Sequence, residues 1–365
     1  MDTLNNARDT INQIDRQLAE LFVKRMQAVK EVACYKEERG LPIFDPTREK
    51  EVLEKAASYV EDDALRSYYL LLQKELMRVS KAYQHTLIKG VRIAYSGVAG
   101  AFAAIASEKL FPEATLVPCR DFESAYRAVE TGECELAVLP IENSHAGEVG
   151  EVLDLTYRGS LTITGVYDLS IRHHLLALEG ATPADIKTVI SHPQALDQCA
   201  AYIKEKGYAA ERAVNTAVAA QTVVEKGDKS IAAIASRSTA SLYGLTVLDH
   251  DVNESATNTT RFAVYSRVEN QAGNKKDRVF VLLFTVSNIA GALAKAVNVI
   301  SAYGFNMRVL RSRPVKDKPF AYYFYAEAEG DERSENGKAM LRALSACCEN
   351  LKLAGSYTPS AILEN

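Results

Sequence analysis

The residues best suited to chemistry in the first 40 positions are three cations on the apolar face of a predicted helix. That face is marked by residues at the spacing of a packed helix: Leu4, Ile11, Leu18, Phe22, Val29 and Val32. Arg8, Arg25 and Lys36 occupy positions on the same face. A buried charge without a partner is costly, so each cation must reach solvent, pair with a nearby carboxylate, or meet an acidic ligand. Three cations on one face favour a binding site for an acidic ligand over solvent exposure or pairing with nearby carboxylates.

Helix geometry limits which of these cations can share one ligand. Arg25 and Lys36 are 11 residues apart, about three turns, so they project from nearly the same side. Arg8 lies 17 residues before Arg25, about 25 Å along the axis. No small anion spans that distance on a straight helix. Arg8 must therefore serve a different pocket, most simply that of a second chain, and we expect a helical dimer.

Two further polar groups have helical spacing. Asp45, Arg48 and Glu49 stand at i, i+3 and i+4, and Ser80 and Gln84 at i and i+4. With the cations of the first helix they could close a polar pocket. The alternative for the first group is a solvated turn at the start of a helix.

Residues 90–268 carry polar clusters where predicted strands end, the usual place for ligands in open α/β sheets. The candidate site residues there are Glu142, Asn143, Ser144, Ser191, His192, Thr216, Thr260, Arg261 and Phe262. Some of these could instead be structural, with His192 in a helix cap and Asn143 in a turn. The sequence has no metal-ligand spacing, so we expect no metal and no cofactor. It has no nucleophile elbow, which speaks against a Ser–His–Asp triad.

Three regions of different periodicity must position these residues. Residues 1–88 read as three helices, the first ending near Gly40 and the others starting after Asp45 and Asp62. Residues 90–268 alternate short β-branched runs with helices, which predicts an α/β unit with a mostly parallel sheet. Val268–Asp277 is a plausible linker. Residues 278–358 have the order βαββαβ, which suggests a ferredoxin-like sandwich.

Composition excludes several classes of function. A chain of 365 residues can form two or three domains, and its net charge of −4 gives no sign of nucleic-acid binding. No apolar run approaches the ~20 residues of a membrane helix, and the polar N-terminus does not read as a secretory signal. Six scattered cysteines without a CxxC indicate reduced thiols and a cytoplasmic location.

Residues 4–86 resemble the all-helical chorismate mutase family. Its pocket positions are matched by Arg8, Arg25, Lys36, Asp45, Arg48, Glu49, Ser80 and Gln84. The resemblance implies an intertwined dimer that rearranges chorismate to prephenate. It implies that Arg8, Arg25 and Arg48 hold carboxylates and that Lys36 and Gln84 lie at the ether oxygen. Glu49 and Asp45 would orient the ring hydroxyl and neighbouring cations.

Residues 90–268 resemble the prephenate dehydratase family. Its motifs stand here as Pro-Ile-Glu-Asn-Ser at 140–144, Ser-His-Pro-Gln-Ala-Leu at 191–196 and Thr260-Arg261-Phe262. The resemblance implies a two-lobed fold similar to type 2 periplasmic binding proteins, and formation of phenylpyruvate. Thr260 would aid hydroxyl departure, with Glu142, Asn143 and Gln198 around the substrate and Arg261 near its carboxylates. Ala99 and Ala103 stand where the family usually has Pro and Ser, which removes a hydroxyl contact.

Residues 278–358 resemble an ACT domain, a sensor of amino acids. The family's phenylalanine-binding stretches are matched by Asn288, Gly291, Ala292, Leu293, Ser312, Arg313 and Pro314. Arg311 stands where the family usually has Glu, Ala290 replaces Pro and Ala294 replaces Val. These departures support an alternative reading, a dimerisation module with weak or no ligand binding.

Together the resemblances predict a bifunctional enzyme of phenylalanine synthesis that forms a homodimer or higher homo-oligomer. Its partners would be chorismate, prephenate and the effector phenylalanine, with no nucleic acid and no membrane. The alternative is an active chorismate mutase fused to a module that senses small molecules without catalysis. Ala103 and Arg311 favour that alternative, whereas Thr260, Glu142 and Asn143 speak against it.

Overall fold

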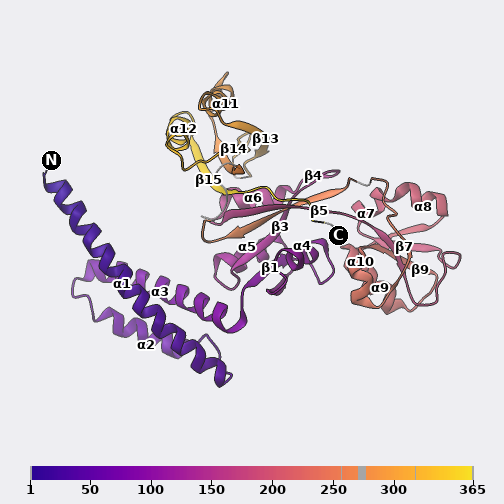
Figure 1. Ribbon diagram of the computed structural model, residues 1–365, viewed down its shortest axis with the longest axis horizontal. Coiled ribbons are helices and arrows are strands. Elements are labelled where there is room, and N and C mark those ends of the chain that lie inside the picture. Colours follow the sequence, from indigo (N-terminus) through magenta and orange to yellow (C-terminus); the bar gives the residue numbers. More distant parts are fainter. Residues whose placement is uncertain (1, 256, 270–276, 317, 364–365) are drawn as a thin grey trace. The chain divides into compact units, whose positions relative to one another are not determined.

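The computed structural model describes residues 2–255, 257–269, 277–316 and 318–363 (Figure 1). The chain forms two compact units, one of residues 1–92 with 131–135 and one of residues 93–130 with 136–365. Most of the predicted linker Val268–Asp277 lies outside the described residues.

The first unit is helical, as predicted. Its helices are α1 (Asp2–Glu38), α2 (Pro46–Ala57) and α3 (Asp63–Lys89). Asp45 caps α2 by accepting the backbone N–H of Arg48 at 3.0 Å, and Asp62 caps α3 by accepting that of Ala64 at 2.8 Å. Gly40 adopts a φ of 62° just after α1, which favours a residue without a Cβ. The predicted end of the first helix and the predicted starts of the other two are confirmed.

Helix α1 leaves much of its apolar face exposed in the single chain. Its 37 residues extend about 55 Å, whereas α3, which packs against it, has 27 residues and extends about 40 Å. Large apolar side chains that are more than half exposed include Leu4, Ile11, Leu18 and Leu21. Exposed apolar surface of this extent usually marks a protein interface.

The second unit begins with two α/β lobes. The first lobe contains β1 (Arg92–Ser96), α4 (Phe102–Leu110), β2 (Thr115–Cys119), α5 (Phe122–Glu130), β3 (Leu136–Asn143), β4 (Gly147–Glu148), α6 (Gly150–Arg158), β5 (Thr162–Ser170) and β11 (Thr259–Ser266). The second lobe contains β6 (His174–Ala177), β7 (Thr188–Ser191), α7 (Pro193–Gln198), α8 (Ala200–Lys206), β8 (Ala209–Arg212), α9 (Thr216–Lys226), β9 (Ile231–Ala235), α10 (Arg237–Tyr243) and β10 (Thr246–Asp249). Each lobe has its own apolar core.

The prediction of a mostly parallel sheet is wrong. Parallel pairing joins β1 to β3 and β7 to both β8 and β9. The long strand β11 runs antiparallel to β3 and β5, and β6 is antiparallel to β9 and β10. The chain leaves the first lobe after β5 and returns to it as β11, and these two strands pair side by side. Strands that carry the chain out and back in this way must run in opposite directions.

The C-terminal sandwich follows the predicted order βαββαβ. It consists of β12 (Val279–Thr285), α11 (Ala292–Ala302), β13 (Asn306–Pro314), β14 (Tyr322–Glu329), α12 (Glu335–Ser345) and β15 (Asn350–Tyr357). Its strands lie in the order β13-β14-β12-β15, and β15 continues into the first lobe by pairing with β5. Gly355 permits that junction, because a Cβ there would lie 2.1 Å from the backbone oxygen of Ile163.

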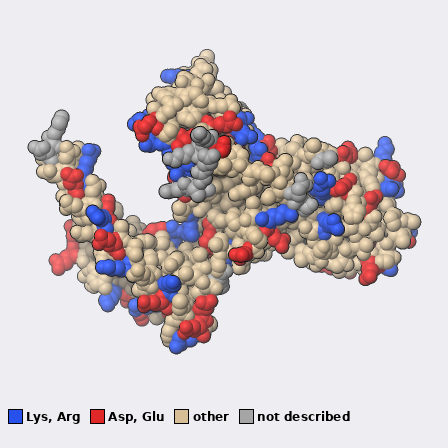
Figure 2. Space-filling view, viewed as in Figure 1, with Lys and Arg blue, Asp and Glu red and all other residues tan. Residues whose placement is uncertain are grey.

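The surface of the helical unit carries charges of both signs. Figure 2 shows acidic and basic side chains interspersed along it, rather than one basic field, on the face in view. Among the described residues no helix has the length and apolar character needed to cross a membrane.

Candidate active sites

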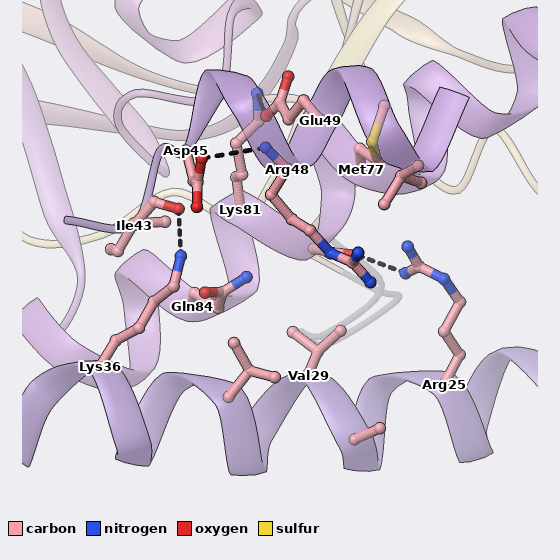
Figure 3. Close-up of a pocket in the computed structure, with 14 residues that line it drawn as sticks. Arg25, Val29, Lys36, Ile43, Asp45, Arg48, Glu49, Met77, Lys81 and Gln84 are labelled. Atoms are coloured by element: carbon pink, nitrogen blue, oxygen red, sulfur yellow. Dashed lines mark hydrogen bonds and ion pairs between the residues drawn. The ribbon is translucent and has the colours of Figure 1, made fainter. Parts of the chain in front are cut away.

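A cavity of about 300 Å³ opens between the three helices of the first unit (Figure 3). The predicted residues Arg25, Lys36, Asp45, Arg48, Glu49, Ser80 and Gln84 all line it. The structure therefore brings together side chains that are up to 59 positions apart, from Arg25 to Gln84. Lys81 also lines the cavity, although the sequence analysis did not select it.

The polar contacts hold these cations at the cavity wall. Arg25 donates to the hydroxyl of Ser80, and Lys36 Nζ donates to the backbone oxygen of Ile43 at 2.7 Å. Lys81 lies 2.7 Å from Glu49, so that carboxylate is partly neutralised. The cavity contains four cationic and two acidic side chains, an excess of positive charge that suits a dianionic ligand.

Gln84 adds a polar group at the closed side of this cavity. Its side chain is 7% exposed, and its Oε1 lacks a hydrogen-bond partner among the described atoms. In Figure 3 the amide nitrogen of Gln84 faces the cavity. A buried acceptor without a partner costs free energy, so a ligand that donates a hydrogen bond to Oε1 would be stabilised there.

Arg8 does not line this cavity. Its side chain is exposed on α1, many turns before Arg25. This placement agrees with the expectation that Arg8 and Arg25 of one chain do not bind the same ligand.

A second cavity, of about 340 Å³, lies in the cleft between the two lobes of the second unit. Of the residues predicted for this site, Asn143, His192, Gln198, Thr216, Thr260 and Phe262 line it. The first lobe supplies residues from β3, β11 and the start of α4, and the second lobe supplies them from α7 and α9.

Asn143 and Thr260 meet at the floor of this cleft. They are direct partners in the pairing of β3 with β11, and Asn143 Nδ2 donates to Thr260 Oγ1 at 3.0 Å. Asn143 Oδ1 accepts the backbone N–H groups of His145 and Ala146, each at 3.0 Å, which fixes the orientation of the amide. Thr260 donates none of the bonds described, so its proton is available to a ligand.

Helix N-termini provide much of the positive potential in the cleft. Helices α4 and α9 both begin at its wall, and no side chain caps the N-terminus of α4. Free N–H groups and the helix dipole favour an anion at such a position. Among the described residues that line the cleft, Arg120 is the only charged one, and its side chain is largely exposed.

The two histidines of the cleft are neutral at neutral pH. Burial lowers the pKa of His192, whose Nδ1 accepts the backbone N–H of Gln194 at 3.3 Å. Burial lowers the pKa of His173 to about 4. His173 Nε2 lies 3.0 Å from Gln198 Oε1, which also accepts from Asn258 Nδ2 at 2.8 Å. His173 Nε2 is therefore the protonated nitrogen, and the amide nitrogen of Gln198 is left without a partner among the described atoms.

Glu142 and Arg261 do not line the cleft, contrary to expectation. They pair with each other across β3 and β11 at 3.5 Å, and Arg261 Nε lies 3.0 Å from Asp168. Burial lowers the pKa of Arg261, but its hydrogen bond to Asp168 and the charge of that carboxylate outweigh burial and raise it. Successive side chains of a strand point to opposite faces of the sheet. Because Asn143 and Thr260 face the cleft, the side chains of Glu142 and Arg261 lie on the other face.

Two predicted serines are structural. Ser191 is fully buried and donates to the backbone oxygen of Ile234 at 2.6 Å. Ser144 is exposed in the turn after β3, where its hydroxyl accepts the backbone N–H of Thr259 at 3.0 Å. The alternative of a helix cap is also confirmed for His192, which caps α7 with Pro193 in its first turn.

Several residues that line the cleft were not selected from the sequence as candidate site residues, although Gln194 stands in the motif at 191–196. They include Ser96, Phe102, Arg120, Phe122, His173, Gln194 and Asn215. Asn215 follows the pattern of a helix N-cap, which is the signal that could have identified it. Ala103 also lines the cleft. The hydroxyl of the serine that the family usually has at this position is therefore absent from the cavity wall.

The predicted effector residues lie in two places on the C-terminal sandwich. Asn288, Gly291, Ala292 and Leu293 belong to the exposed loop and first turn of α11, and Ser312, Arg313 and Pro314 belong to β13. The guanidinium of Arg313 points to the first lobe instead, 2.5 Å from Glu148 and 3.1 Å from Asp154. Ser312, on the opposite side of the strand, is exposed.

Comparison with known proteins identifies both units. Residues 7–85 match type II chorismate mutase and residues 93–270 match prephenate dehydratase. The chain is 29% identical over 367 residues to the bifunctional chorismate mutase/prephenate dehydratase of Enterobacter agglomerans, which covers 96% of this chain and 94% of the relative.

Two other relatives match the second unit. Arogenate dehydratase/prephenate dehydratase 2 of Arabidopsis thaliana is 35% identical over 276 residues, 73% of this chain and 72% of the relative. The crystal structure of prephenate dehydratase from Arthrobacter aurescens in complex with L-Phe has 26% sequence identity and a TM-score of 0.69, and covers 74% of this chain and 93% of that chain. The chain therefore belongs to the family of bifunctional chorismate mutases and prephenate dehydratases.

Proposed function

We propose that this chain converts chorismate to prephenate in the helical cavity and prephenate to phenylpyruvate in the cleft of the second unit. One observation carries this proposal: a single chain contains a cation-lined cavity of about 300 Å³ and, separately, a cleft in which Asn143 binds Thr260. The bifunctional relative of Enterobacter agglomerans matches the chain across both units.

In the helical cavity the reaction needs positioning and charge stabilisation only. Chorismate is a dicarboxylate, and its rearrangement breaks an ether bond and forms a carbon–carbon bond with no proton transfer. We assign Arg25 and Arg48, with Arg8 of a second copy, to the carboxylates. Lys36 and Gln84 then hydrogen-bond the ether oxygen, where negative charge develops in the transition state. The place of both side chains in the cavity lining supports this assignment.

In the cleft the reaction breaks two bonds of prephenate. The ring carboxylate leaves as CO₂, its bonding electrons enter the ring, and the ring hydroxyl leaves as hydroxide from the opposite carbon. Aromatisation supplies the driving force. Thr260 is oriented for this step because its oxygen already accepts from Asn143, so its proton can be donated to the departing oxygen. Threonine is a weak acid, and we assign it hydrogen-bond stabilisation rather than full proton transfer.

The lining of the cleft favours prephenate over arogenate, its 2-amino counterpart. An ammonium group needs a carboxylate or several acceptors when it leaves water. Among the described residues of the cleft none carries a carboxylate, whereas two helix N-termini and Arg120 favour anions. We expect kcat/KM for prephenate to exceed that for arogenate by about a hundredfold or more. Equal values for the two substrates would contradict this assignment.

We further propose three domains: residues 1–88 as chorismate mutase, 90–268 as prephenate dehydratase and 278–358 as an ACT regulatory domain. The βαββαβ order of the C-terminal sandwich supports the last assignment. The relative from Arthrobacter aurescens binds L-Phe, which supports phenylalanine as an effector here. Titration of phenylalanine against the dehydratase rate tests this: inhibition that saturates supports it, and an unchanged rate contradicts it.

A homodimer would complete the first active site. The exposed apolar residues of α1 and the distance of Arg8 from the cavity support this arrangement. An Arg8→Ala chain mixed with an Arg25→Ala chain should recover mutase activity, because one pocket of the mixed dimer keeps both arginines. Recovery should be about a quarter of wild type if chains exchange at random; a mixture as inactive as its parents would contradict shared pockets.

The direct test of the function is incubation of purified protein with chorismate. Formation of phenylpyruvate with one CO₂ per turnover supports both activities. Accumulation of prephenate would leave only the mutase, and absence of turnover would contradict the whole proposal. We also propose a cytoplasmic location, which cell fractionation would test.

A further inference from the structure

Arg311 reverses the charge expected at its position, and the structure provides a partner for it. The residue lies on β13 of the C-terminal sandwich, and its guanidinium forms an ion pair with Glu142 of β3 in the first lobe. Its side chain is 20% exposed. An arginine at this depth needs an anion, and a glutamate in its place would face another carboxylate.

The pair is one end of a chain of alternating charges. Glu142 also pairs with Arg261 of β11, and Arg261 pairs with Asp168 of β5. Arg261 is the direct partner of both Glu142 and Asp168 in the strand pairing. The four side chains therefore connect the C-terminal sandwich to three neighbouring strands behind the cleft.

The residues next to this charged chain form the floor of the cleft. Asn143 follows Glu142 on β3, Thr260 precedes Arg261 on β11, and these two neighbours are themselves hydrogen-bonded. A rotation of β3 that releases Glu142 would move Asn143 and lengthen its bond to Thr260. Hydrogen bonds of this kind act on a reaction only within narrow limits of distance and angle.

The sandwich is also attached to the first lobe at sites that do not involve Arg311. Arg313 contacts Glu148 and Asp154, and the hydroxyl of Tyr323 donates to Asp154 at 2.8 Å. The strands β15 and β5 pair with each other as well. Removal of Arg311 should therefore leave the sandwich attached, so that effects on catalysis can be separated from loss of the interface.

We propose that Arg311 is a positioning residue for the dehydratase reaction, acting through Glu142 to hold Asn143 and Thr260 in their productive geometry. This inference rests on the proposed function of the cleft. It assigns a contact of the C-terminal sandwich to catalysis itself, present whether or not an effector binds.

The test compares Arg311→Lys, Arg311→Met and Arg311→Glu with Arg308→Met as the matched control. Arg308 is on the same strand, but it pairs with Glu329 within the sandwich. We expect kcat for prephenate to fall about tenfold in Arg311→Met and further in Arg311→Glu, with KM changed less than about threefold. Arg311→Lys should retain most of the activity, and Arg308→Met should retain all of it. The mutase rate of each variant reports on general damage to the chain.

Hydrogen exchange gives a readout that does not depend on turnover. In Arg311→Met, amides of residues 140–149 should exchange about tenfold faster than in wild type, while those of β12 stay unchanged. Faster exchange in both segments would indicate loss of the interface and overturn the proposal. Wild-type kcat together with wild-type exchange in Arg311→Glu would also overturn it. If wild-type protein does not dehydrate prephenate, the proposed function fails, and the exchange comparison still decides whether Arg311 orders β3.

Discussion

At the scale of single residues, the cleft depends on one hydroxyl whose hydrogen bonds leave its proton available. Asn143 donates to Thr260, and Thr260 donates none of the described bonds, so it can donate to a ligand. Thr260→Val should lower the dehydratase kcat by about a hundredfold, a typical cost for one lost donor in a transition state, while Thr260→Ser should retain most of the rate. Thr259→Val is the matched control, because the neighbouring hydroxyl donates to the backbone of Thr257 outside the cleft.

The buried imidazole of His173 predicts a dependence of stability on pH. Its pKa is lowered to about 4 in the folded chain from an ordinary 6.5. Between these values the unfolded chain binds a proton that the folded chain does not, so stability is retained above pH 6.5 and lost as the pH falls toward 4. The loss should be about 3 kcal/mol from this group alone. Urea unfolding of the second unit from pH 7.5 to 4 measures it, and His173→Gln should have a shallower profile; parallel profiles would contradict this role.

At the scale of elements, one glycine joins the sheet of the C-terminal sandwich to the first lobe. Gly355 has a φ of 136°, and a Cβ there would meet the backbone of Ile163. Gly355→Ala should therefore lower the free energy of unfolding of the second unit by about 3 kcal/mol. Gly304→Ala is a matched control with a φ of 78° and open space around its Cβ position, so it should cost only about 1 kcal/mol. Equal costs for the two substitutions would show that β15 does not depend on this contact.

The elements also show what the sequence could and could not predict. Helix caps at Asp45 and Asp62 act locally, so helix ends were predicted accurately. Glu142 and Arg261 stand in motifs beside residues of the cleft, but their side chains point away from it. A motif identifies a stretch of chain, whereas the strand pairing decides which of its faces meets the ligand. Arg120 and His173 stand in connecting segments that only the tertiary fold brings to the cleft.

At the scale of the whole molecule, two sets of residues that share no side chain serve two reactions of one chain. The helical cavity is formed entirely by α1, α2, α3 and the loop before α2, and the cleft entirely by the second unit. The two activities should therefore be lost independently.

The most direct measurement follows chorismate, prephenate and phenylpyruvate by NMR in wild type, Arg25→Ala and Thr260→Val. Wild type should convert chorismate through prephenate to phenylpyruvate. Thr260→Val should convert chorismate at the wild-type rate and accumulate prephenate, whereas Arg25→Ala should leave chorismate unchanged but still consume added prephenate. If either substitution abolished both reactions in a folded protein, or if wild type converted neither substrate, the assignment of two separate active sites would be contradicted.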